Sequence, residues 1–217
     1  MFKYIPLIIC VCVIGILIYL KFSPESPKFK FPDKSLFHCY GDNCVYYRVT
    51  NGLFPIKQQT KYSCWAASLT MLLSWKEHKK LKIEEVVKRF GNKFQSLYNN
   101  SESIGIAIED EFQLYERAGL KIMQQLSLSI EGWEYYLREC GPLSVTIDAN
   151  PPYGGTIHAI LVTGIYGRRD ASNTMLSYID PLDGKEHLID FKKFIQMYEA
   201  KYSVDWLIQV IYFPKTT

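Results

Sequence analysis

The spacing of hydrophobic residues changes at Pro142, from a helical period before it to a strand-like period after it. Apolar residues at helical spacing predict helices at about 63–80, 83–90, 108–118 and 131–140. Runs of β-branched and aromatic residues predict strands at 45–49, 143–147, 158–166, 175–179, 186–191 and 206–213, with a short helix near 191–200. Helices followed mainly by strands indicate an α+β domain with an antiparallel sheet.

The N-terminal segment differs from the rest of the chain. The stretch Tyr4–Leu20 carries no charge and is flanked by Lys3 and Lys21. It is at the short end of what crosses a bilayer as a helix, and no small-residue cleavage site follows it. We therefore expect a single-pass transmembrane anchor at 1–21, with a cleaved signal peptide and a secreted protein as the alternative. Lysines are denser after the segment than before it, which favours a cytoplasmic domain without deciding the orientation.

The remaining sequence divides into a linker and one domain. Residues 22–44 are rich in Pro, Lys, Ser and Phe and predict an extended linker, and residues 45–217 have a globular pattern. The chain of 217 residues contains 48% hydrophobic residues, which fits one packed core. A formal net charge of +3 without a long Lys/Arg run argues against nucleic-acid binding. Nothing in the pattern indicates an oligomeric state.

The six cysteines do not suggest a disulfide scaffold at this chain length. Cys10 and Cys12 fall in the apolar stretch, and Cys140 falls on the packed face of a predicted helix. Cys39 and Cys44 flank a turn-rich tetrapeptide, so they form either a small disulfide or two free thiols. An oxidised pair would indicate an extracytoplasmic domain. A metal site is not expected, because no second pair of ligands completes a tetrahedral set.

Cys64 opens a predicted helix in the run QQTKYSCWAAS. The N-terminus of a helix offers free backbone N–H groups and the positive end of the helix dipole, and both favour an ionised, nucleophilic thiol. The same N–H groups form half of an oxyanion hole, and a side-chain amide upstream can form the other half. Gln58 and Gln59 both lie at a suitable distance in the sequence. The structural alternative is that Cys64 is a small buried helix residue.

His158 and Asp180 are the other candidates for catalysis. His158 opens a predicted strand after a Gly-rich loop, where a base could reach a nucleophile on a neighbouring helix. Asp180 ends the next strand, in YIDPLDG, where its carboxylate could fix the tautomer of the histidine. Each alone is ordinary core or turn chemistry, but with Cys64 they form an ordered Cys-His-acid set. His187 lacks a Gly-rich lead-in and is a weaker candidate for the base.

These motifs together resemble the papain-like cysteine peptidase superfamily, in particular the bacterial branch with the avirulence-effector proteases of plant pathogens. The bacteriocin-leader peptidases share the same arrangement of Gln, Cys, His and Asp-Pro. The resemblance covers about residues 52–213 and includes Trp133 and the Gly141-Pro142-Leu143 passage. It implies a helical half at about 52–119, a sheet half at about 120–217 and a cleft between them.

The resemblance also implies a role for each site residue. Cys64 would be the nucleophile, His158 the base, and Asp180 the acid where papain itself has Asn. Gln58 would be the oxyanion donor, because its offset from Cys64 matches the papain spacing, although a shift by one position would give this role to Gln59.

The function implied is a cysteine protease or isopeptidase that acts on protein or peptide substrates through a thioester intermediate, without metal or cofactor. A glutamine deamidase or transamidase with the same triad is one alternative, and a catalytically inactive, membrane-tethered binding module is another. The branch further suggests a role as a bacterial effector.

Overall fold

The structure of the protein is a computed structural model, which describes residues 41–124, 127–150, 157–200 and 209–215. Its helices are α2 (Cys64–Lys76), α3 (Ile83–Arg89), α4 (Asn92–Asn99), α5 (Ile108–Arg117), α6 (Ile130–Cys140) and α7 (Phe191–Tyr198). Its strands are β1 (Cys44–Arg48), β2 (Lys121–Gln124), β3 (Leu143–Asp148), β4 (Ile157–Arg168), β5 (Thr174–Asp180), β6 (Lys185–Asp190) and β7 (Gln209–Tyr212).

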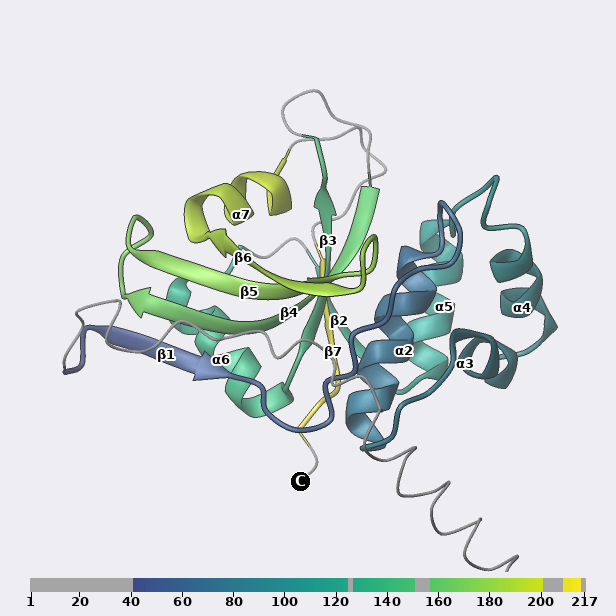
Figure 1. The fold of residues 1–217 in the computed structure, drawn as a ribbon, viewed down its shortest axis with the longest axis horizontal. Helices are drawn as coiled ribbons and strands as arrows, with labels where there is room; N and C mark the ends of the chain where they lie inside the picture. Colours follow the sequence, from purple (N-terminus) through teal and green to yellow (C-terminus); the bar gives the residue numbers. More distant parts are fainter. Residues whose placement is uncertain (1–40, 125–126, 151–156, 201–208, 216–217) are drawn as a thin grey trace, which may run out of the picture. The chain divides into compact units, whose positions relative to one another are not determined.

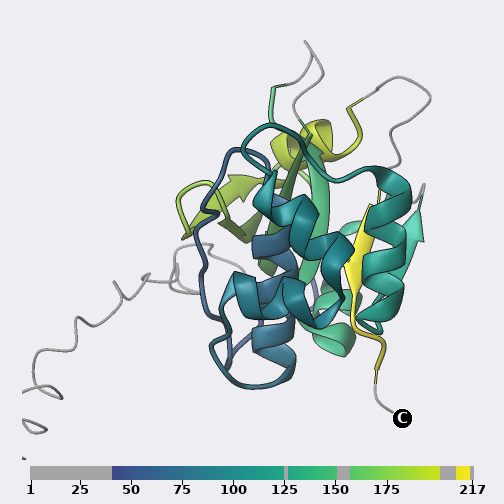
Figure 2. The ribbon, with the colours of Figure 1, turned by 90° about the vertical axis from the view of Figure 1, so that its right-hand side faces the viewer.

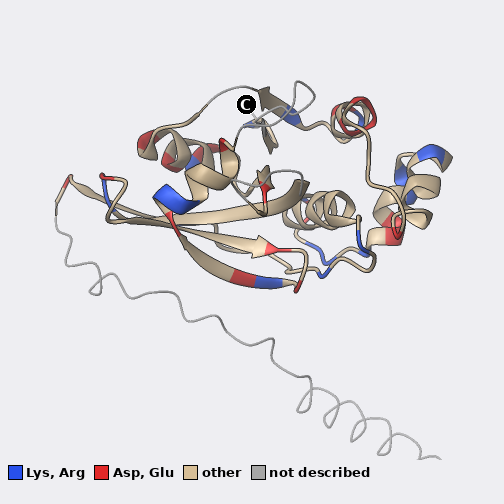
Figure 3. Ribbon diagram, turned by 90° about the horizontal axis from the view of Figure 1, so that it is seen from above, with Lys and Arg blue, Asp and Glu red and all other residues tan. Residues whose placement is uncertain are grey.

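One antiparallel sheet contains all the strands, in the order β2-β7-β3-β4-β5-β6, with β1 paired to β4. The 12-residue strand β4 is central: its first half pairs with β3, and its second half lies between β1 and β5. Acidic and basic residues lie mainly on helix surfaces and in turns, whereas β3, apart from Asp148 at its end, and most of β4 are uncharged and buried (Figure 3). The predicted α+β class with an antiparallel sheet is confirmed.

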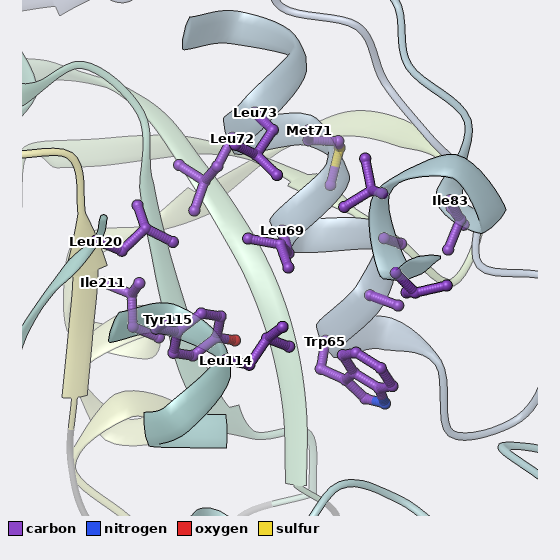
Figure 4. Packing of buried hydrophobic residues seen from close by; sticks show 14 of the residues in the cluster. Trp65, Leu69, Met71, Leu72, Leu73, Ile83, Leu114, Tyr115, Leu120 and Ile211 are labelled. Carbon is purple, nitrogen blue, oxygen red and sulfur yellow. The ribbon is translucent and has the colours of Figure 1, made fainter. Parts of the chain in front are cut away.

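The helices α2 to α5 form a group beside the sheet (Figures 1 and 2). Every residue of α2 from Trp65 to Ser74 is buried, as expected for a helix that is apolar on all sides. Leu69 and Leu72 of α2 lie in one core with Leu114 and Tyr115 of α5, on the face of the sheet that contributes Ile211 (Figure 4). This packing fixes α2, and therefore its first residue, against the sheet.

The other face of the sheet packs against α6 and α7. Both helices begin at a side-chain cap: the Ser129 hydroxyl accepts from Gly132 N, and the Asp190 carboxylate accepts from Lys193 N. The ring of Trp133 in α6 lies edge-on to Phe194 in α7, with 5.1 Å between ring centroids. The strands that carry the candidate site residues are therefore covered on both faces.

Some elements differ from the prediction. The helix α4 and the strand β2 were not expected, and α2 ends at Lys76 rather than near residue 80. The strand β1 lies before the helical group in sequence but belongs to the sheet, so the division into a first helical half and a second sheet half is incomplete. The beginning of the strand predicted at 206–213 lies outside the described residues.

The predicted membrane anchor at 1–21 and most of the predicted linker also lie outside the described residues. Among the residues that are described, no helix has the length and apolar character needed to cross a membrane. The anchor stays a prediction.

Gly141, directly after α6, lies against Trp75 of α2, so a substitution there reports how tightly these two helices pack. Its φ is +81°, and an added Cβ would lie 2.2 Å from two atoms of the Trp75 ring at the end of α2. We expect Gly141→Ala to lower the free energy of unfolding by about 3 kcal/mol, from backbone strain and overpacking together.

Gly119→Ala is the matched control for this substitution. Gly119 has a similar φ of +73°, but nothing lies within 4 Å of the added Cβ. This variant should lose only about 1 kcal/mol, from backbone strain. Equal losses in chemical denaturation would show that the contact with Trp75 does not contribute.

Candidate active site

Cys64 is the first residue of α2 and is half-buried, whereas the residues that follow it, Trp65 to Ser74, are buried. The N-cap residue Ser63 does not cap the helix with its hydroxyl group. That hydroxyl instead donates to Thr60 O and accepts from Thr60 N, each at 3.1 Å. Ala66 N and Ala67 N donate to Ser63 O, each at 3.1 Å, whereas the N–H of the first helical residue, Cys64, has no acceptor in the helical pattern and could donate to a ligand.

The loop before Cys64 is fastened to the connection between α4 and α5. The hydroxyl groups of Thr60 and Ser101 lie 2.6 Å apart, and Tyr62 N donates to Ser101 O at 2.8 Å. Ser101 is fully buried. Cys64 is therefore positioned both by the core around α2 and by this loop.

Gln58 lies at the beginning of the same loop and is almost fully buried. Its Nε2 lies 2.9 Å from both Thr60 O and Lys61 O, whereas its Oε1 has no hydrogen-bond partner. The two carbonyl groups define the orientation of the amide, because only its nitrogen can donate to them. Its neighbour Gln59 is exposed.

His158 and Asp180 face each other from neighbouring strands. His158 Nε2 lies 2.7 Å from Asp180 Oδ1, and the side chains are 13% and 21% exposed. His158 is near the start of β4 and Asp180 is the last residue of β5, and the pairing of Leu161 with Ile179 fixes this register. Asp180 Oδ1 also accepts from Leu182 N at 2.8 Å, which holds the carboxylate toward the histidine.

The electrostatics of the site connect His158 to Cys64 as well as to Asp180. Burial by itself would lower the pKa of His158, but hydrogen bonds to Asp180 and Cys64, with the negative charge of both groups, raise it to about 9. Burial would raise the pKa of Asp180, but the hydrogen bond from His158 brings it below its ordinary value. These interactions favour the imidazolium form of His158 and the carboxylate form of Asp180.

Three of the four predicted site residues are in contact, and the fourth, Gln58, is bonded through its backbone to the residue after Asp180. Cys64, His158 and Asp180 form one chain of interactions, and Gln58 N donates to Pro181 O at 2.7 Å, next to Asp180. Within the described residues, no group of three or more His, Cys, Asp or Glu side chains could hold a metal ion.

The remaining candidates lie apart from this set or outside the described residues. His187 Nε2 bonds to Asp183, at 3.0 and 3.1 Å from its two carboxylate oxygens. Cys140 is a buried free thiol, and Cys44 is disulfide-bonded. Its predicted partner, Cys39, lies outside the described residues, so the pairing stays a prediction.

One neighbour of Cys64 was not predicted from the sequence. Tyr115 on α5 is fully buried and donates to Glu111 Oε1 at 2.9 Å. Burial raises the pKa of Tyr115, and the charges of Glu111 and Cys64 raise it further. In sequence, Tyr115 is one of several apolar positions on α5, and nothing in that pattern distinguishes it.

A family model described as "Papain-like cysteine protease AvrRpt2" matches residues 50–199. The chain belongs to this family. The papain-like resemblance noted in the sequence is thereby confirmed, and so is its assignment to the cysteine peptidases.

Other comparisons were made with curated proteins and with solved structures. No curated protein matches the chain. One similar structure is the peptidase domain of Streptococcus ComA, a bifunctional ABC transporter involved in a quorum-sensing pathway. It has 14% sequence identity and a TM-score of 0.48, and the match covers 75% of this chain and 99% of that one.

Proposed function

We propose that the protein hydrolyses peptide bonds with Cys64 as nucleophile, His158 as proton carrier and Asp180 as the residue that orients His158. The observation that carries this proposal is the chain of interactions from Asp180 through His158 to Cys64 at the start of α2. A nucleophile, a base and a group that orients the base are the parts that acyl transfer requires.

The reaction follows from the positions of these groups. The Cys64 thiolate attacks the substrate carbonyl carbon, and the carbonyl oxygen becomes an oxyanion. When the C–N bond breaks, the His158 imidazolium donates its proton to the leaving amine, and a thioester remains on Cys64. His158 then takes a proton from water, the hydroxide attacks the thioester, and the carboxylic acid product leaves. The thiolate and the imidazolium are restored at the end of the cycle.

Cys64 N–H and the Gln58 amide are the proposed donors to the oxyanion. In the structure both hydrogens of the amide nitrogen are directed at Thr60 O and Lys61 O, so the amide has to release one of these carbonyl groups to donate to the oxyanion. A donor directed at the oxyanion stabilises its developing charge.

The substrate proposed is a protein or a peptide. The test is mass spectrometry of a peptide library treated with the full chain or with its Cys64→Ala variant. New peptide termini that require Cys64 would support peptidase activity. Release of ammonia without new termini would indicate the deamidase alternative, and no product at all would indicate a binding module.

The pH dependence of the reaction follows from the His158–Asp180 pair. His158 keeps its proton up to a pKa of about 9 and loses it above that value, so kcat/KM should fall as the pH rises through about 9. Asp180→Asn removes the negative charge that helps to raise this pKa. We therefore expect the alkaline limb of the profile to move to lower pH in this variant, in measurements from roughly pH 6 to 10.

Asp170→Asn is the control for this change of charge. Asp170 lies in the turn between β4 and β5, where its Oδ1 accepts from Ser172 N and Asn173 N. Its profile should match that of the wild type. If the alkaline limb of the kcat/KM profile stayed at the wild-type pH in Asp180→Asn, the assignment of His158 and Asp180 as a coupled pair would be wrong.

A further inference from the structure

The turn between β5 and β6 contacts both parts of the proposed catalytic machinery. At one end, Asp180 Oδ1 accepts from His158 and from Leu182 N of the turn. At the other side, Pro181 O accepts from Gln58 N at 2.7 Å. One short segment therefore sets the position of Asp180 and of Gln58.

The turn approaches the Gln58 loop backbone to backbone. Gly184 has a φ of +69°, and an added Cβ would lie 2.8 Å from Lys57 N and 3.0 Å from Lys57 Cα. Gly184 N also donates to Asp180 O at 2.8 Å, which closes the turn. Because no side chain fits between the two segments, a shift of the turn has to move the residues next to Gln58.

A second His–Asp pair, Asp183 and His187, forms a brace that holds this turn. Asp183 Oδ1 accepts from Lys185 N at 2.9 Å, and His187 Nε2 lies 3.0 and 3.1 Å from the two Asp183 oxygens. The His187 ring lies against Tyr178 of β5, with 5.5 Å between the ring centroids. Desolvation would raise the pKa of Asp183, but the hydrogen bond from His187 brings it below its ordinary value. The pair links the tip of the turn to both strands that bear it.

We propose that Asp183 and His187 are positioning residues, which hold the β5–β6 turn and, through the bond from Gln58 N to Pro181 O, keep Gln58 in the place from which its amide is proposed to reach the oxyanion. This inference rests on the proposed function. Cys64 does not depend on this brace in the same way, because the core around α2 and the bond between Thr60 and Ser101 hold it. Loss of the brace should therefore weaken stabilisation of the oxyanion without moving Cys64.

The experiment uses the full chain with Asp183→Asn and with His187→Phe, which keeps an aromatic ring against Tyr178 but cannot bond to Asp183. We expect kcat to fall roughly 10- to 100-fold, less than for outright loss of an oxyanion donor, with KM nearly unchanged. The affinity for a peptide aldehyde should fall by the same factor, because the thiol adds to the aldehyde carbon to give a tetrahedral hemithioacetal whose oxygen lies where the oxyanion would. Alkylation of Cys64 by iodoacetamide, which needs no oxyanion hole, should stay within about twofold.

Two further variants separate positioning from general stability. In His187→Gln the amide nitrogen can reach Asp183 as Nε2 does, so this variant should recover much of kcat. Asp170→Asn removes an equivalent carboxylate from the turn at the other end of β5 and should leave kcat unchanged, while thermal unfolding reports any loss of the fold in each variant.

Three results would overturn the proposal: wild-type kcat in both Asp183→Asn and His187→Phe, an equal loss in Asp170→Asn, or a parallel loss of alkylation. All three leave the proposed function standing. A wild-type chain whose Cys64 is alkylated but which neither cleaves peptides nor binds the aldehyde would overturn the proposed function and the brace together.

Discussion

Alanine at Cys64 or at His158 is expected to abolish peptide cleavage, and alanine at both positions should be hardly worse than either change alone. The structure links the two side chains through one interaction, so removing either partner removes the same step. Each single variant should lose kcat by a factor on the order of 10⁴ to 10⁶, as for other coupled catalytic groups. The loss of kcat should be smaller in Asp180→Ala, because Asp180 orients the base and takes no part in bond making.

Cys140→Ala is the control for the loss of a thiol, because Cys140 is the other free cysteine among the described residues and is buried in α6. Its kcat should be unchanged. The assignment of the base would be wrong if His187→Ala stopped alkylation of Cys64 at neutral pH while His158→Ala did not. If the losses of kcat in the two single variants multiplied in the double variant, Cys64 and His158 would not act as one catalytic unit.

Gln58→Ala should lower kcat by about 10²- to 10³-fold, as for other lost oxyanion donors, and should leave alkylation of Cys64 nearly intact. The physical reason is that this variant lacks the amide proposed to exchange one of its bonds to Thr60 O and Lys61 O for a bond to the oxyanion, from a buried position in the loop that leads into Cys64. The measurement is kcat together with the rate of iodoacetamide labelling of Cys64.

Gln59→Ala is the matched control, because Gln59 is exposed and immediately adjacent. Its kcat should be close to that of the wild type. The opposite result, with a harmless change at Gln58 and a damaging one at Gln59, would mean that the alignment to the papain spacing is off by one residue.

The elements that carry the site were predictable because their sequences are long and strongly patterned. The helix that begins at Cys64 and the strand that begins near His158 have long apolar runs bounded by polar or Gly-rich segments. In contrast, α4 buries only Phe94 and Tyr98, and β2 is short with no fully buried residue, so neither gives a clear period. Gly91 and Asn92 predicted the end of one helix, but they also begin the next.

The contacts within the site were less predictable than its residues. The order of Cys64, His158 and Asp180 follows from local motifs, but the distance of 2.7 Å between His158 and Asp180 depends on strand register and on the irregularity between Val162 and Gly164. The bond from Gln58 N to Pro181 O joins segments that are far apart in sequence. Such a contact is a property of the folded chain and leaves no local signal.

The pairing of β1 with β4 determines where the catalytic domain can be cut. The family match begins at residue 50, but the strand that covers Gly164–Arg168 of β4 is Cys44–Arg48. A fragment that begins at residue 50 would present the unpaired N–H and C=O groups of β4 to solvent. Such an open edge pairs readily with the edge of another molecule and leads to aggregation. Expression of the domain alone therefore requires a start ahead of Cys44, even though the chemistry lies far along the chain from that residue.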